Sequence, residues 1–175
     1  MLENDKKKFI LNAAFGFAIS DSFRRNHIYC KKITDKQKKD FKIAIKQYLR
    51  DNLNTFIEQI TVEEYINIVS AFSNHFSDRF SNILTGERLR IGTAQKLIGM
   101  FLKYLWIFGY TCKKPFLCPF DNIILQQHLR LNGKWTELDD VNQYRSIIQA
   151  ALRDANGLSL AQWELQTYNR IAYNQ

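Results

Sequence analysis

A lysine and an aspartate, Lys96 and Asp121, are the two residues of this chain whose types and settings best suit chemistry. Lys96 lies in a strongly amphipathic segment after a glycine-containing turn, and Asp121 follows Pro119 at the start of another apolar segment. A carboxylate at a rigid helix start can activate water or stabilise positive charge on a substrate, and a nearby amine can assist it. The sequence therefore predicts a catalytic pair with Asp121 as the principal group and Lys96 as the accessory amine or a phosphate contact.

Both residues also have structural interpretations, which the sequence leaves open. An aspartate in the first turn of a helix complements the helix dipole, which contributes roughly 0.3–1 kcal/mol without any chemistry. Lys96 and Lys103 stand seven residues apart with Gly99 between them. Lysines at the rim of a buried helix commonly lay their stems on apolar surface and keep only the ammonium group in water. A glycine on that face lets a phosphate or another backbone segment come close.

Residues 85–129 resemble part of the helix-hairpin-helix DNA glycosylase superfamily, whose members grip DNA with a glycine hairpin and act on its bases. The residues that carry the resemblance are Gly86, Ile91, Gly92, Thr93, Ala94 and Asp121. The resemblance implies that N–H groups of the hairpin hold a DNA phosphate and that Asp121 lies at the reacting sugar. The segment from Gly86 to Gly92 is longer than the family's tight hairpin, and Gly92 stands where bifunctional members carry a lysine.

Positive charge gathers in the N-terminal third of the chain. The net charge is +8, and residues 1–60 hold 13 Lys and Arg against 7 Asp and Glu. Such an excess suggests an anionic partner, nucleic acid first, and a solubilising surface is the alternative explanation. Within this region a spacing of three, four and four residues predicts one exposed basic stripe on a helix. The basic stripe consists of Lys39, Lys42, Lys46 and Arg50.

The glycine turn and the loop after Asp121 supply the other candidate nucleic-acid contacts. Trp135 follows the Asn132-Gly133 turn and is the best candidate for a partly exposed ring that could stack on a base. The alternative for Trp135 is a hydrophobic contact with the helix that follows. These candidates are Gly86, Arg88, Arg90, Gly92, Thr93, Lys103 and Trp135.

Apolar residues recur at helical spacing along the whole chain, and only two prolines and seven glycines interrupt them. The pattern predicts an all-α bundle in a single domain, residues 1–175, with residues 1–33 as a peripheral helix and a basic connection. Thr34 with Gln37, and Thr61 with Glu64, are capping signals at two helix starts. Helices are expected at about 6–22, 35–59, 62–84, 93–109, 120–129, 136–154 and from 160 onward.

The sequence lacks the motifs that are typical of zinc proteins, nucleotide-binding proteins and hydrolases with a catalytic triad. The three cysteines match no zinc pattern, and neither a phosphate-binding loop nor a catalytic triad is visible. We therefore expect no metal or organic cofactor, and the absence of a long apolar stretch favours a cytoplasmic protein without a membrane partner. The leading hypothesis is a DNA-interacting helical protein of the glycosylase type. The alternative is a non-catalytic interaction or regulatory protein whose basic N-terminal half binds an acidic protein or nucleic acid.

Overall fold

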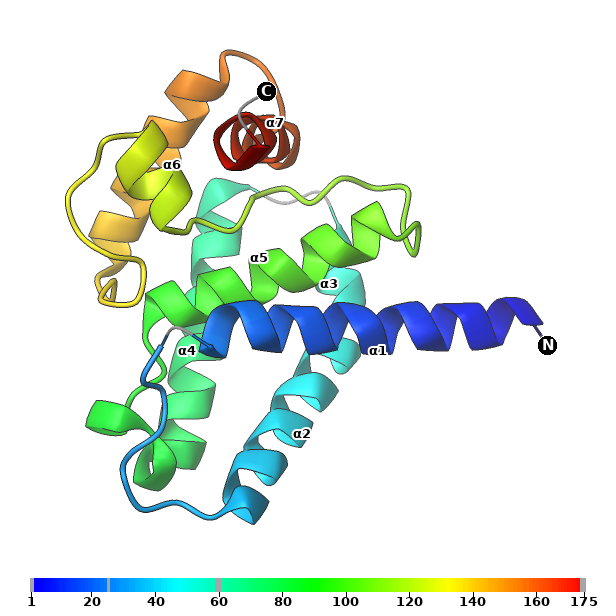
Figure 1. The fold of residues 1–175 in the computed structure, drawn as a ribbon, viewed down its shortest axis with the longest axis vertical. Helices are drawn as coiled ribbons and strands as arrows, with labels where there is room; N and C mark the ends of the chain where they lie inside the picture. The colour runs from blue at the N-terminus through cyan, green and yellow to red at the C-terminus, as the bar shows by residue number, and fades with distance from the viewer. Residues whose placement is uncertain (1, 25, 59–60, 174–175) are drawn as a thin grey trace.

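The apolar periodicity of the chain produces an all-α bundle in the computed structural model, which describes residues 2–24, 26–58 and 61–173 (Figure 1). Two short 3₁₀ helices, η1 (Ser81–Ile83) and η2 (Thr85–Glu87), and a π-helix, η3 (Ile123–His128), lie in the connections. The only β-type pairing in the described ranges is an isolated bridge between Tyr29 and Leu84, so the predicted fold class is confirmed. The α-helices are α1 (Leu2–Phe23), α2 (Asp35–Asp51), α3 (Leu53–Ile57), α4 (Val62–Phe80), α5 (Ile91–Ile107), α6 (Val141–Ala155) and α7 (Leu160–Tyr173).

Local capping signals fix the starts of α2 and α4, as predicted. Thr34 and Thr61 each accept a hydrogen bond from the backbone N–H three residues later, and Gln37 and Glu64 accept the N–H of the cap residue in return. These reciprocal bonds satisfy N–H groups that the first turn of a helix leaves without partners. The C-terminal end of α5 also has a local signal. Gly109, just after this helix, has φ 74°, a conformation that glycine adopts without steric cost and that commonly ends helices.

The helix predicted at 35–59 is interrupted near its end. Asn52 turns its side-chain amide onto the carbonyl oxygen of Tyr48 at 2.9 Å, and such a local side-chain bond competes with helix continuation. The chain therefore leaves α2 at Asp51 and continues as the short α3. Gln59, the predicted helix end, lies outside the described residues, and so does Arg25 in the predicted basic connection.

Two other predicted helices differ from the structure. The helix predicted from Thr136 begins five residues later, because Asp140 is the cap and accepts the N–H of Gln143 at 2.7 Å. The segment predicted as an ordinary helix at 120–129 forms the π-helix η3, which begins well after Pro119. Short π-helical turns are rare and occur frequently at functional sites.

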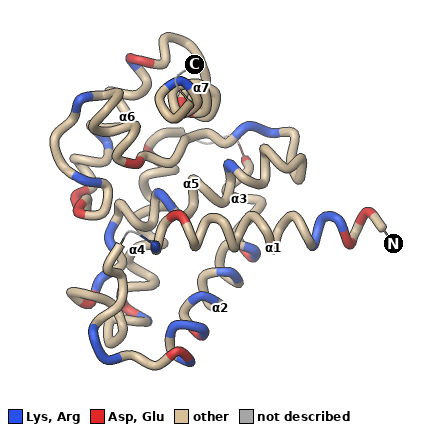
Figure 2. Tube along the Cα trace, in the orientation of Figure 1, with Lys and Arg blue, Asp and Glu red and all other residues tan. Residues whose placement is uncertain are grey.

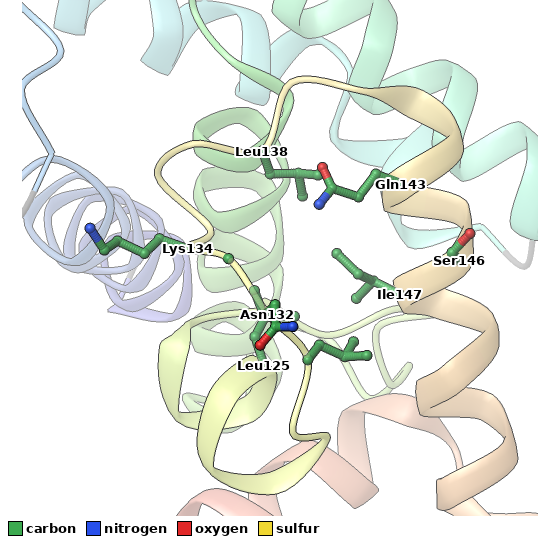
Figure 3. Close-up of a pocket in the computed structure, with 9 residues that line it drawn as sticks. Leu125, Asn132, Lys134, Leu138, Gln143, Ser146 and Ile147 are labelled. Carbon is green, nitrogen blue, oxygen red and sulfur yellow. The ribbon is translucent and has the colours of Figure 1, made fainter.

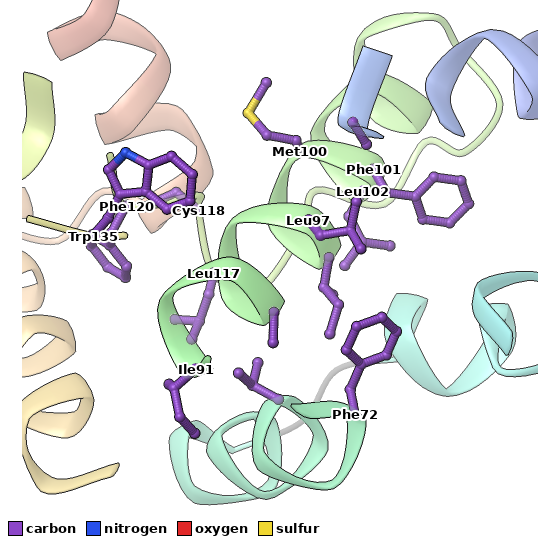
Figure 4. Packing of buried hydrophobic residues seen from close by; sticks show 14 of the residues in the cluster. Phe72, Ile91, Leu97, Met100, Phe101, Leu102, Leu117, Cys118, Phe120 and Trp135 are labelled. Carbon is purple, nitrogen blue, oxygen red and sulfur yellow. The ribbon is translucent and has the colours of Figure 1, made fainter. Parts of the chain in front are cut away.

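Helix α5 lies at the centre of the bundle, and the other elements pack around it. Every residue from Ile91 to Leu102 is buried. Figure 4 shows Trp135 and Phe120 on one side of α5 and Phe72 of α4 on another. A helix that is surrounded in this way must present an apolar surface in all directions or provide partners for its polar groups. The polar residues Thr93, Gln95, Lys96 and Lys103 of α5 therefore identify the places where the core is not purely apolar.

Helix α1 is peripheral only over its first half. Ala14, Ala18 and Ser22 are fully buried, and these small side chains let the second half of α1 lie closely along α5. Its first turns extend beyond the rest of the bundle (Figure 1), and Phe9 is 73% exposed. The predicted peripheral position of residues 1–33 therefore does not hold for the second half of α1, which forms part of the core.

Candidate functional site

One face of α5 brings two irregular chain segments unusually close to the helix backbone. A Cβ atom at Gly99 would lie 2.9 Å from the backbone nitrogen of Pro119, and one at Gly92 would lie 1.7 Å from the carbonyl oxygen of Trp135. Only glycine fits at either position without moving the neighbouring backbone. The segment before Asp121 and the segment around Trp135 thus flank Lys96, which lies between the two glycines on α5.

Lys96 and Asp121 form a partly buried ion pair at the point where these segments meet. Lys96 Nζ lies 3.0 Å from Asp121 Oδ2, with 8% and 20% of the two side chains exposed. The ammonium group also lies 5.0 Å from the ring centroid of Trp135, within cation–π distance. Asp121 Oδ1 accepts the N–H groups of Ile123 and Ile124 at 3.0 and 3.2 Å. The capping role and the pairing role of Asp121 therefore coexist, one on each oxygen.

The π-helix that follows Asp121 is fixed at its other end as well. His128 Nε2 lies 2.6 Å from Asp154 Oδ2 at the end of α6, and the indole N–H of Trp163 donates to the same oxygen at 2.8 Å. These bonds lower the pKa of Asp154, with the His128 contact as the main cause. The π-helix that Asp121 caps is therefore anchored at both ends, which holds the carboxylate in place as a positioned reactive group requires.

A second lysine–carboxylate pair lies two turns further along α5. Lys103 Nζ donates to both carboxylate oxygens of Glu164 at 2.9 and 2.8 Å. Burial raises the pKa of Glu164, and the charge of Lys103 opposes that change. The ammonium group lies 5.1 Å from the ring centroid of Tyr168. The two lysines of α5 thus have equivalent environments, each with one carboxylate and one aromatic ring.

Both pairs line the same cavity, which we call the lysine cleft. It has a volume of about 510 Å³ and lies between α1, α5, α7 and the segments that carry Asp121 and Trp135. Asp21 of α1 contributes a carboxylate that accepts the hydroxyl of Tyr104 at 2.7 Å. Cavities of this size accommodate small organic groups. Its principal lining residues are Asp21, Arg24, Lys96, Lys103, Asp121, Lys134, Trp135, Glu164 and Tyr168.

A smaller pocket, which shares Lys134 with the lysine cleft, lacks comparable groups. Its volume is about 160 Å³, and it is formed by the loop around Asn132 and by α6 (Figure 3). Leu125, Leu138 and Ile147 are among its apolar lining residues, and the side chain of Lys134 points away from it. This pocket offers an apolar surface but no pair of groups for acid–base chemistry.

The predicted phosphate grip of the glycine turn does not fit the structure. The N–H of Gly92 donates to the carbonyl oxygen of Leu138 at 2.8 Å, and that of Thr93 bonds within its own helix. Thr93 is buried, and its hydroxyl accepts the side-chain amide of Asn26. Backbone N–H groups that already donate to protein acceptors cannot hold a DNA phosphate. Gly86 (φ 65°) provides a left-handed turn, which explains its presence without a ligand.

The two arginines of the turn have different settings. Arg88 donates from Nε to Asp139 at 2.6 Å, so this side chain is part of an internal ion pair. Arg90 is exposed, and among the described residues its guanidinium group donates to the carbonyl oxygen of Thr136 at 2.9 Å. It borders a cavity of about 210 Å³ that shares Thr136 with the lysine cleft. Both arginines line this cavity, and Arg90 is the more exposed of the two.

Lys and Arg recur along α2 (Figure 2), but the predicted basic stripe is only partly a free surface. Lys39 and Arg50 are exposed, whereas Lys42 and Lys46 are half-buried. Lys46 donates to the side chain of Asn12 on α1, and its ammonium group lies 5.7 Å from the ring of a phenylalanine on that helix. The prediction of one uniformly exposed stripe is therefore wrong at Lys42 and Lys46. The stripe also lies outside the lining of the lysine cleft.

Trp135 is buried, which overturns the expectation of a partly exposed ring. Only 4% of the residue is exposed, and its backbone packs against Gly92. The sequence also did not single out Gln95 and Glu164, two polar residues that the structure places in or beside the cleft. Glu164 could have been found, because it lies on the buried side of α7 with Leu160 and Thr167. An acid at such a position requires a paired cation.

Comparison of the chain with protein-family models, curated proteins and solved structures finds no match. No helix in the described part of the chain combines the length and apolar character that crossing a membrane requires.

Proposed function

We propose that this protein binds DNA and hydrolyses a base–sugar bond in the lysine cleft, in the manner of a DNA glycosylase. The observation that carries the proposal is the Lys96–Asp121 pair, held on two anchored elements at the wall of a cavity of about 510 Å³. Buried ion pairs contribute little to stability compared with apolar residues of the same volume. Ionisable groups that converge in a cleft are therefore better explained by chemistry than by folding.

The chemistry assigns one task to each group of the pair. The bond between the sugar carbon and the base nitrogen breaks, and its electron pair leaves with the base, which takes a proton from the Lys96 ammonium group. Asp121 stabilises the positive charge on the sugar and accepts a proton from the water whose oxygen bonds to that carbon. Transfer of this proton from Asp121 to Lys96 across 3.0 Å restores the pair. Neither a metal nor an organic cofactor is needed for these steps.

The other end of the cleft suits recognition of a flat heterocycle. Trp135 and Tyr168 are among the residues that line the cleft, and the ammonium groups of Lys96 and Lys103 lie over their rings. Lys103 offers a donor and Glu164 an acceptor, and base-processing enzymes distinguish an extruded base by contacts of these kinds. A base that enters the cleft would displace part of the Lys103–Glu164 contact and bond to both residues.

Basic side chains border the cleft where a DNA backbone would pass. Arg24 lines the lysine cleft, and Arg90 lines the adjoining cavity. Both are exposed, and within the described residues neither forms an ion pair. Such cations gain affinity for phosphates by releasing counterions, which makes binding salt-dependent. The net charge of +8 supports the same kind of partner.

Two measurements test the proposal together. Fluorescence anisotropy with duplex and single-stranded oligonucleotides at 50 and 200 mM salt should give an affinity that falls about tenfold or more as salt rises. Oligonucleotides carrying a panel of damaged and mismatched bases should release a base with the native protein and not with Lys96→Gln. Lys39→Gln, a lysine of α2 outside the cleft, is the matched control and should retain activity. Absence of both salt-sensitive binding and base release would remove this function.

A non-catalytic interaction protein remains the second candidate, and the exposed first half of α1 favours it. Phe9 is 73% and Leu2 71% exposed, beside a run of three lysines at residues 6–8. A basic helix with unburied apolar side chains is typical of segments that dock on an acidic protein surface. Light scattering and a pull-down with the full chain and with Phe9→Ser would test this candidate. A partner lost in the Phe9→Ser variant supports it, and an unchanged partner profile counts against it.

A further inference from the structure

Gln95 joins the two chain segments that carry the candidate catalytic pair. Only 1% of this residue is exposed. Its side-chain Oε1 accepts the N–H of Phe120 at 3.0 Å, and its Nε2 donates to the carbonyl oxygen of Phe120 at 2.8 Å. Nε2 also donates to the carbonyl oxygen of Gly92 at 3.0 Å. One amide thus holds both backbone polar groups of a fully buried residue in a segment without regular structure.

The neighbours of the two bonded residues are the two members of the pair. Lys96 follows Gln95 on α5, and Asp121 follows Phe120 at the entry to η3. Because each reactive side chain belongs to the residue next to one end of the amide contact, little backbone freedom remains between Lys96 Nζ and Asp121 Oδ2. The close approach of Pro119 to Gly99 fixes the same segment from the other side. The contact between Gln95 and Phe120 therefore fixes the position of Asp121 relative to Lys96, and it also satisfies buried polar groups.

We propose that Gln95 is a positioning residue, which sets the distance and orientation of the Asp121 carboxylate relative to Lys96 through the backbone of Phe120. An amide is the side chain suited to this task, because it donates and accepts at once and carries no charge. A carboxylate in its place keeps the acceptor and faces two carbonyl oxygens, and a thioether makes none of the three bonds. The catalytic consequence rests on the function proposed above, whereas the geometric consequence is independent of it.

The geometric part is tested by the coupling between Lys96 and Asp121 in the unfolding equilibrium. We use a double-mutant cycle that consists of Lys96→Met, Asp121→Asn and the variant that carries both changes. Urea unfolding measures this cycle in three backgrounds, which are the native protein, Gln95→Met and Gln95→Glu. Ile98→Val is the control background, because Ile98 is buried in the same helix and makes no hydrogen bond to the segment before Asp121. We expect a coupling of about tenfold in the unfolding constant with Gln95 present, and of about twofold or less in both Gln95 variants.

The outcomes separate positioning from general stability. Gln95→Met leaves buried backbone groups without partners, so it is expected to lower stability, and Gln95→Glu keeps the bond from the N–H of Phe120 in case the first variant does not fold. A coupling that persists at about tenfold in either folded variant would overturn the inference. A loss of coupling in the Ile98→Val background as well would also overturn it, because the effect would then follow stability alone.

The catalytic part uses single-turnover base release at saturating DNA. We expect Gln95→Glu to lower the rate about a hundredfold, the size of effect that a misplacement of about 1 Å produces, with the Kd for DNA unchanged. An unchanged rate contradicts the positioning role. If Lys96→Gln releases the base as fast as the native protein, the proposed function fails, and the coupling cycle alone then decides the role of Gln95.

Discussion

Asp121 contacts Lys96 with one carboxylate oxygen and caps the following helix with the other. Oδ2 lies 3.0 Å from Lys96 Nζ, while Oδ1 accepts two backbone N–H groups of η3. A carboxylate that served only as a cap would leave Oδ2 to solvent. A mobile reactive group would lack the bonds that Oδ1 accepts from the backbone. The arrangement fixes a carboxylate on the wall of the lysine cleft, and it lets the structural and chemical contributions be separated by substitution.

Two glycines give a prediction about close packing. Gly92→Ala should lower the free energy of unfolding by about 3 kcal/mol, because its Cβ would lie 1.7 Å from the carbonyl oxygen of Trp135. Gly16→Ala in α1 is the control, since among the described residues no atom outside the nearby backbone of α1 lies within 4 Å of the added Cβ. That change should raise stability by about 0.5–1 kcal/mol through helix propensity. Urea unfolding of both variants gives the comparison, and equal effects would mean that Trp135 does not lie against α5.

The aromatic core between α2 and α4 gives a second prediction. Phe76 is fully buried, with ring centroids of Phe72 and Tyr48 at 4.7 and 5.5 Å. Phe76→Ala should lower the free energy of unfolding by about 3–5 kcal/mol, because it removes this contact and leaves a cavity. Phe17→Ala, at a ring that is 49% exposed, is the control. A loss below about 1 kcal/mol at Phe76 contradicts the described core.

The pH dependence of stability tests the environment of Glu164. Burial raises its pKa above the ordinary 4.5, so the folded protein retains a proton that the unfolded chain releases as pH rises. The contribution of Glu164 to the free energy of unfolding is therefore present at low pH and is lost as the pH rises through the raised pKa. The native protein should therefore lose stability relative to Glu164→Gln as pH increases from 4.5. The opposite trend would show that the attraction of Lys103 outweighs burial.

Charge reversals locate the DNA surface. Arg24→Glu and Arg90→Glu should each weaken DNA binding and lower the slope of log K against log salt by about 0.7–0.9 per lost contact, because both residues border the cavities. Lys39→Glu with Arg50→Glu should change binding little, because both lie on α2 outside the cleft. Anisotropy titrations at several salt concentrations measure both sets. A reversed pattern would favour the basic N-terminal half as the partner surface.

Much of the fold was predictable because its signals are local. Thr34 and Thr61 cap helices through residues three positions away, so their role is visible in a short stretch of sequence. Lys96 and Asp121 stood out for the same reason, since each lies beside an obvious glycine or proline. Asn52 misled the prediction, because a single side-chain bond decides whether the helix continues there.

Contacts between distant segments could not be predicted in the same way. Glu164 meets Lys103 across 61 residues, and Gln95 meets Phe120 across 25. No local pattern specifies such a partner, although a glutamate or glutamine on a buried helix face indicates that one exists. The burial of Trp135 likewise depends on Gly92, and neither residue alone predicts that the other lies against it.

The most direct test of the account is Asp121→Asn, followed by single-turnover base release and urea unfolding on the same protein. Asparagine caps about as well as aspartate, so the variant should remain folded and lose about 1–3 kcal/mol, mainly from the charge it no longer offers Lys96. It should bind DNA with nearly native affinity and release no base, because neither the sugar cation nor the attacking water has its carboxylate. A folded Asp121→Asn protein that releases bases at the native rate would contradict the central claim and leave Asp121 as a helix cap.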